Sequence, residues 1–177
     1  FPYTTLFRSR ELLPPGKAGM LLVKGPNIMQ GYLGRQDLTE KAMSDGWYVT
    51  GDIAIMDESG FLKITDRLSR FSKIGGEMVP HGKVEDALHE ALGSEIRVFA
   101  VTSVPDERKG ETLAVLHTID EEKIPEILDK MATMDLPNLF IPKKDKFVKV
   151  EKIPVLGTGK VDLRGVKDAA MAVLCPS

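Results

Sequence analysis

Apolar residues follow two different patterns along the chain, and the change falls near residue 67. Before this point, short apolar runs alternate with turn residues, as in strands joined by tight turns. Strands are predicted over 20–24, 53–57 and 61–65. The stretch Glu58-Ser59-Gly60 between the last two is typical of a hairpin. A short helix is predicted over 37–43, with Asp37 as its N-cap and Glu40 at the capping-box position.

After residue 67 the pattern mixes helical and strand periods. Helices are predicted over 83–92, 124–134 and 163–174, and strands over 98–101, 112–118 and 147–150. An extended segment over 72–79, interrupted by Gly75-Gly76, precedes them. The order helix, strand, strand, helix, strand, helix indicates a small α+β domain, in which helices pack on a three-stranded sheet.

The first nine residues, Phe-Pro-Tyr-Thr-Thr-Leu-Phe-Arg-Ser, resemble the translation of a common sequencing-adapter oligonucleotide. We interpret residues 1–9 as an artefact rather than an N-terminal strand and leave them out of fold reasoning. The natural protein is then expected to extend further upstream, and this chain to be a fragment. The remaining chain divides into a β-rich part, 10–67, and an α+β domain, 68–177.

Composition excludes several classes of protein. Hydrophobic residues make up 42% of the chain and charged residues 28%, as in a globular protein, and the net charge of -2 provides no basic surface for nucleic acid. No apolar run approaches the roughly 20 residues of a membrane helix. Cys175 is the only cysteine, and the three histidines lack metal-ligand spacing, so no metal site is predicted. A single cysteine is compatible with a cytoplasmic protein.

The first candidate motif is the stretch 46–52, which ends in Thr50-Gly51-Asp52. A carboxylate that follows a glycine, on a loop entering a strand, can accept hydrogen bonds from both hydroxyls of a ribose. The glycine lets the backbone approach the ligand closely. The alternative is a turn capped by Asp52, and this stretch alone favours that alternative.

The second candidate motif is the stretch 66–80, which contains several cations followed by Gly75-Gly76. Cations near a nucleotide would offset phosphate charge. A glycine-rich strand permits the close approach of a narrow ligand such as a pantetheine arm. A solvated charged linker with a bulge explains the same residues equally well.

The third candidate motif is the stretch 154–162, which carries Lys160 on a glycine-rich loop. It is not a Walker loop, because Val161 rather than serine or threonine follows the lysine and the upstream glycine spacing differs. The Lys160 ammonium could still stabilise charge on a carboxylate and a phosphate together. The alternative is an ordinary surface lysine.

The three motifs in this order resemble the adenylate-forming (AMP-binding) superfamily of acyl-CoA synthetases, peptide-synthetase adenylation domains and luciferases. The resemblance covers about 19–164 and includes the upstream stretch 25–33. Within the superfamily, the stretches 70–79 and 154–160 are most similar to the acyl-ACP synthetase module of 2-acylglycerophosphoethanolamine acyltransferase.

The resemblance implies a fold and a set of roles. The fold would be the last β-rich piece of a large N-terminal domain followed by a small C-terminal lid domain. Asp52 would bind the ribose of ATP and Arg67 would contact the nucleotide. Lys160 would be catalytic, bridging the substrate carboxylate and the α-phosphate. Gly75 and Gly76 would line the channel for the acceptor thiol. Ser69 would occupy the hinge, where the family usually has Asp or Lys.

The resemblance also implies the partners. The substrates would be ATP, with a Mg²⁺ ligand upstream of this chain, a fatty acid, and acyl carrier protein as acceptor. CoA is the alternative acceptor, and fusion to a lysophospholipid acyltransferase is a further expectation. Any membrane association would come only through missing upstream parts. An alternative of another class is a non-catalytic lid domain that docks a carrier protein. Because the family's main phosphate loop and acyl pocket lie upstream, this chain alone is expected to be inactive.

Overall fold

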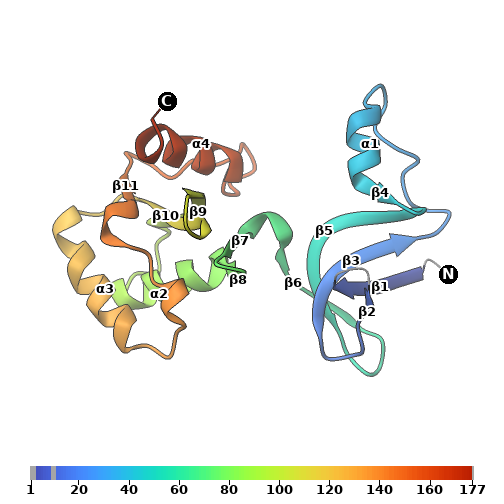
Figure 1. Cartoon of the computed structure of the whole chain (residues 1–177), viewed down its shortest axis with the longest axis horizontal. Helices are drawn as coiled ribbons and strands as arrows, with labels where there is room; N and C mark the ends of the chain where they lie inside the picture. The colour runs from blue at the N-terminus through green and yellow to red at the C-terminus, as the bar shows by residue number, and fades with distance from the viewer. Residues whose placement is uncertain (1–2, 9–10, 177) are drawn as a thin grey trace. The chain divides into compact units, whose positions relative to one another are not determined.

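The computed structural model describes residues 3–8 and 11–176 and divides the chain into two compact units. The first unit ends at Leu68 and the second begins at Ser69, one residue after the division that we placed between 67 and 68. Figure 1 shows the elements of each unit, which are described separately.

The first unit is an antiparallel sheet with one short helix. Its strands are β1 (Tyr3–Arg8), β2 (Glu11–Leu12), β3 (Ala18–Lys24), β4 (Met43–Ser44), β5 (Trp47–Met56) and β6 (Leu62–Arg67). The strand order is β2-β1-β3-β5-β4, and β6 pairs with the other part of β5. The helix α1 (Gln36–Ala42) precedes β4. Leu21 and Ala54 are buried and form a small core between β3 and β5.

The first unit differs from the sequence-based expectation in three places. Tyr3–Arg8, which we had left out of the fold as part of an artefact, forms β1 and pairs with β3. This pairing is independent of whether the segment belongs to the natural protein. Asp37 does not cap α1; the cap position is Arg35, whose guanidinium donates to the Asp37 carboxylate instead. Strand β5 begins at Trp47 rather than at residue 53, because a bulge accommodates the glycine that interrupts its pattern.

The second unit contains a three-stranded sheet between helices. Its strands and α-helices are β7 (Phe71–Ile74), β8 (Glu77–Pro80), α2 (His81–Leu92), β9 (Phe99–Asp106), β10 (Gly110–His117), α3 (Ile124–Thr133), β11 (Phe147–Lys149) and α4 (Leu163–Leu174). A 3-10 turn at Leu68–Arg70 spans the boundary between the units, and further 3-10 turns lie at Glu121–Lys123, Asn138–Phe140 and Lys144–Lys146. The sheet order is β11-β10-β9, with β9 antiparallel and β11 parallel to β10. The predicted three-stranded sheet with packed helices is confirmed.

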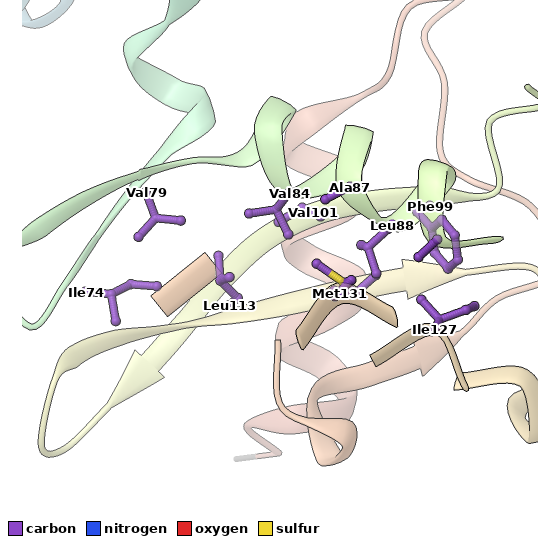
Figure 2. Close-up of a cluster of buried hydrophobic side chains, with 12 residues drawn as sticks. Ile74, Val79, Val84, Ala87, Leu88, Phe99, Val101, Leu113, Ile127 and Met131 are labelled. Carbon is purple, nitrogen blue, oxygen red and sulfur yellow. The ribbon is translucent and has the colours of Figure 1, made fainter. Parts of the chain in front are cut away.

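Alternate residues along β9 and β10 face two separate cores. Phe99, Val101, Leu113 and Val115 pack with α2 and α3 on one face of the sheet (Figure 2). Their sequence neighbours, such as Ala100 and Leu116, pack with α4 on the other face. Both strands therefore contain unbroken buried runs, as expected for a sheet covered on both faces.

Helix α4 has the bounds that its periodicity predicts. Its Val166 and Ala170 are buried, but Val173, which we expected to face inward, is 60% exposed. Within the part of the chain that the structure describes, no helix combines the length and the apolar character needed to cross a membrane.

Candidate functional site

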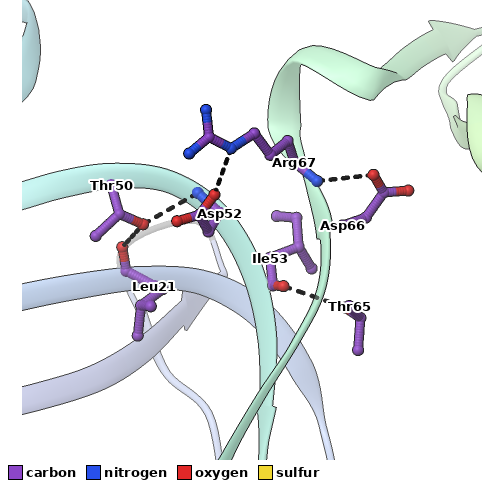
Figure 3. A network of polar contacts seen from close by, with 7 residues as sticks. All are labelled: Leu21, Thr50, Asp52, Ile53, Thr65, Asp66 and Arg67. Atoms are coloured by element: carbon purple, nitrogen blue, oxygen red, sulfur yellow. Dashed lines mark hydrogen bonds and ion pairs between the residues drawn. The ribbon is translucent and has the colours of Figure 1, made fainter. Parts of the chain in front are cut away.

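The Thr50-Gly51-Asp52 stretch forms a bulge in β5. The pairing of β3 with β5 passes from Met20↔Ile53 to Leu22↔Val49, so three residues of β5 lie opposite Leu21 alone. The Thr50 hydroxyl donates to the Leu21 carbonyl at 2.9 Å, and the Asp52 N–H donates to Thr50 Oγ1 at 3.0 Å (Figure 3). Gly51 has a φ of 76°, which explains the glycine at this position. The Thr50 hydroxyl thus satisfies backbone groups that the bulge leaves unpaired.

Asp52 and Arg67 lie directly opposite each other on β5 and β6. The Arg67 Nε–H donates to Asp52 Oδ1 at 2.7 Å, and the side chains are 66% and 16% exposed, respectively. Asp52 therefore lies inside a strand, not on a loop entering one as we had predicted. Arg67 occupies Oδ1, and the second carboxylate oxygen, Oδ2, could accept a ligand hydroxyl.

Ser69 and the two glycines lie at the start of the second unit. Ser69 is exposed, within the 3-10 turn Leu68–Arg70. Gly75 and Gly76 are the two-residue turn of the β7–β8 hairpin, with φ of 59° and 94°. The extended segment predicted over 72–79 is thus a hairpin, because two consecutive residues with positive φ reverse the chain. The Gly75 N–H donates to the Lys109 carbonyl at 3.0 Å, which attaches the turn to the loop between β9 and β10.

Lys160 lies at the base of a short hairpin loop. Val155 and Val161 form an antiparallel bridge, and the Leu156 N–H donates to the Lys160 carbonyl at 2.8 Å. The side chain of Lys160 is exposed and pairs with none of the described carboxylates. The ammonium is therefore free to meet a ligand.

The loop that carries Lys160 is anchored to α4. Asp162 is the N-cap of this helix and accepts from the N–H groups of Arg164 and Gly165, both at 3.1 Å. A Cβ on Gly165 would lie 2.9 Å from Asp162 Oδ2 and 3.1 Å from the Pro154 Cβ. Asp162 and Gly165 were absent from our sequence-based site, although an aspartate directly before a predicted helix is an N-cap signal.

The predicted site residues fall into two groups. Asp52 and Arg67 belong to the first unit, whereas Ser69, Gly75, Gly76 and Lys160 belong to the second. Among the described residues, no group of three or more His, Cys, Asp or Glu side chains is placed to hold a metal ion.

The chain is similar in sequence to several known proteins. No family model matches the chain. It is 37% identical over 156 residues to the feruloyl-CoA synthase of Amycolatopsis sp, a match that covers 86% of this chain and 31% of the relative. It is 35% identical over 160 residues to the long-chain-fatty-acid–CoA ligase of Salmonella typhimurium, covering 88% of this chain and 27% of the relative. The chain thus spans about three tenths of the length of the curated relatives it matches.

Solved structures agree with these relatives. The amide bond synthetase McbA from Marinactinospora thermotolerans matches with a TM-score of 0.71 and 29% identity, over 94% of this chain and 34% of that one. The o-succinylbenzoate CoA synthetase from Bacillus subtilis, in complex with its acyl-adenylate intermediate, matches with a TM-score of 0.70 and 25% identity, over 95% and 34%. The α+β fold matches the C-terminal domain of adenylate-forming enzymes. The homologues and structural neighbours of this chain are AMP-binding, adenylate-forming ligases.

Proposed function

We propose that this chain is the C-terminal part of an ATP-dependent acid–thiol ligase of the adenylate-forming superfamily. The enzyme would join a carboxylic acid to the α-phosphate of ATP, releasing pyrophosphate, and then transfer the acyl group to a thiol, releasing AMP. The observation that carries this proposal is the Asp52–Arg67 pair on a bulged strand, in a chain whose homologues are acid–CoA ligases.

The first unit supports the role of Asp52 and Arg67 at the nucleotide. One oxygen of the Asp52 carboxylate accepts from Arg67, and the other would accept a ribose hydroxyl. Because Arg67 is about two thirds exposed, its remaining N–H groups can donate to a nucleotide. The bulge positions Asp52, since the Thr50 hydroxyl accepts from the Asp52 N–H and donates to the Leu21 carbonyl on β3.

The second unit supports the role of Lys160. A lysine on a short loop, with no carboxylate partner among the described residues, can bring its charge to the carboxylate and α-phosphate during the first step. The anchoring of this loop on α4 through Asp162 would fix the direction from which the ammonium approaches.

The acceptor thiol and the acid are further parts of the proposal. The relatives are named as CoA ligases, which favours CoA over acyl carrier protein, and their names favour a fatty acid or an aromatic acid as the substrate. Acyl carrier protein and fusion to a lysophospholipid acyltransferase rest on the sequence resemblance alone, and a cytoplasmic location rests on the single cysteine.

The proposal is tested in the longer enzyme that contains this chain. ATP–pyrophosphate exchange should require a carboxylic acid, and acyl-thioester formation should require CoA or acyl carrier protein in addition. Exchange that is independent of any acid would overturn the proposal. Offering both acceptors in parallel assays identifies the thiol.

A non-catalytic lid domain that docks a carrier protein is the competing function. It would bind the carrier equally well with and without Lys160, and it would show no ligation in either case. A loss of ligation with unchanged carrier binding in Lys160→Ala instead supports the enzyme.

A further inference from the structure

Two carboxylates, the buried Glu85 and the partly exposed Glu111, contact the chain at and just before the first strand of the β7–β8 hairpin. One of them, Glu85 on α2, has a side chain only 11% exposed and forms an ion pair with Arg70. Its other oxygen, Oε1, accepts from the Val101 N–H at 3.0 Å. Val101 lies on β9, the edge strand of the sheet, so Glu85 satisfies an N–H that no neighbouring strand reaches.

Arg70, the ion-pair partner of Glu85, lies next to the boundary between the two units. It follows Ser69, the first residue of the second unit, and directly precedes β7. Its side chain is 31% exposed, yet its Nε is buried and has no partner among the described residues. A guanidinium that leaves one N–H unsatisfied is held there against its own preference for water, and the Glu85 carboxylate provides the compensating attraction.

Side chains from α2 and β10 make further hydrogen bonds to strand β7. Ser72 Oγ and His81 Nε2 lie 2.6 Å apart in a buried hydrogen bond. The Lys73 N–H donates to Glu111 Oε2 at 2.8 Å, and Glu111 Oε1 accepts from the Ser103 hydroxyl at 2.9 Å. Ser72 and Lys73 of β7 are thus tied to α2 and β10, and Gly75, just after the strand, donates to the loop between β9 and β10.

The consequence is a sharp change in restraint at the unit boundary. Ser69 is exposed, and the described contacts of the second unit begin at Arg70. The Gly75-Gly76 turn is therefore attached within the second unit, through the contacts that begin at Arg70.

We infer that Glu85 is a positioning residue, which acts through Arg70 to fix the direction of the chain as it leaves the boundary and so orients the β7–β8 hairpin. That this hairpin meets the acceptor thiol rests on the proposed function together with the family resemblance, which implies that Gly75 and Gly76 line the thiol channel. The attachment of the hairpin rests on neither. Glu85 touches no reacting atom in this inference.

The attachment is tested by amide hydrogen exchange in the 177-residue chain. Glu85→Gln keeps the side-chain volume and an acceptor for Val101 but removes the charge that holds Arg70. The amides of Lys73 and Gly75 should then exchange on the order of tenfold faster, while that of Ile127 in α3 is unchanged. Glu90→Gln, an exposed position on the same helix, should leave all three amides unchanged. Uniform acceleration, or none, would overturn the inference.

A second variant keeps the test decisive if Glu85→Gln fails to fold. Arg70→Met alone should accelerate the same two amides, and unchanged exchange of both would contradict the inference. Where Glu85→Gln does fold, the double variant should add nothing further, because the two residues act through each other. Full additivity would contradict the inference.

Activity provides the readout that a merely structural role would not change. In the longer enzyme, Glu85→Gln should lower the turnover of thiol transfer while acid-dependent ATP–pyrophosphate exchange and the KM for ATP stay unchanged. Equal loss in both steps would contradict a positioning role. If the wild-type enzyme shows no such exchange, the proposed function fails, and the amide result still decides the attachment.

Discussion

Asp52 and Arg67 lie opposite each other on adjoining strands, and a hydrogen bond of 2.7 Å joins their side chains. The two residues are 15 positions apart in sequence, but the β5–β6 hairpin brings them together at the end of the first unit. The pair combines an acceptor for hydroxyl groups with a donor for anions. This combination suits a nucleotide, which carries both.

Replacement of Asp52 by asparagine should weaken ATP binding without unfolding the protein. A charge-assisted hydrogen bond contributes about 1.5–3 kcal/mol, so the KM for ATP in the longer enzyme should rise roughly ten- to a hundredfold. The Arg67 side chain is 66% exposed, and ion pairs with an exposed partner contribute little to stability. The unfolding free energy of the 177-residue chain should therefore fall by less than about 1 kcal/mol. Initial-rate kinetics and urea denaturation measure the two effects. An unchanged KM would rule out the ribose role.

Lys160→Ala should remove the first half-reaction selectively. Loss of a cation that stabilises transition-state charge lowers turnover about 10²–10³-fold, here in acid-dependent ATP–pyrophosphate exchange. Transfer from a supplied acyl-adenylate to the thiol should continue. The exposed neighbour Lys152, changed to alanine, provides the matched control. Equal losses in the two variants would show that Lys160 contributes only general positive charge.

The sequence predicts the second unit well, because its elements have clear periods and clear ends. Helix α4 has the predicted bounds, since its apolar positions repeat with the helical period and Asp162 provides a cap. The α+β order likewise predicts the three-stranded sheet. Gly75-Gly76 was interpreted as an interruption of one strand, although a glycine pair between two extended runs is also a hairpin signal.

The contacts of the site could not be predicted from the sequence in the same way. The bulge at Gly51 depends on how β5 pairs with β3, which the sequence alone does not reveal. The stretch Thr50-Gly51-Asp52 was therefore predicted to lie outside the strand. The pairs Asp52–Arg67 and Arg70–Glu85 each join residues 15 positions apart. The hairpin that joins β5 and β6 was predicted, but not its extension to Asp52 and Arg67. The Arg70–Glu85 pair depends on the packing of α2 near the start of β7, which no local pattern encodes.

Gly165→Ala should destabilise the second unit by displacing the cap of α4. The added Cβ would lie 2.9 Å from the Asp162 carboxylate and 3.1 Å from Pro154, so one of them must move. Such overpacking costs about 1–3 kcal/mol in unfolding free energy. Thermal denaturation of the 177-residue chain measures it. Gly157→Ala is the matched control, because a Cβ there meets no atom within 4 Å, and its melting temperature should not fall. Equal stability of the two variants would contradict the close approach.

The 177-residue chain alone should be unable to adenylate a carboxylic acid. It spans about three tenths of the length of its relatives, and its described residues form no group of acidic side chains suited to Mg²⁺. Purified chain should therefore show no acid-dependent ATP–pyrophosphate exchange above a blank without protein. Exchange that is retained by the wild-type chain but lost in Lys160→Ala would prove the prediction wrong.

Acid should destabilise the second unit through His81. Burial lowers the pKa of His81 to about 4, and the nearby Arg70 and Lys167 act in the same direction while Glu111 partly opposes them. The unfolded chain has the ordinary pKa of about 6.5, so between pH 6.5 and 4 it binds a proton that the folded chain does not. The unfolding free energy should therefore be highest above pH 6.5 and fall by at most about 3 kcal/mol as the pH approaches 4.

His81→Gln separates this contribution from those of the other titrating groups. Burial also lowers the pKa of His117, but His117 is present in both proteins, so its effect cancels in the comparison. Urea denaturation at pH 7 and pH 5 gives the change in unfolding free energy for each protein. The change should be smaller in His81→Gln, whatever the variant loses at pH 7 through the broken contact with Ser72. If both proteins lose the same free energy between the two pH values, His81 is not the group whose protonation opposes folding.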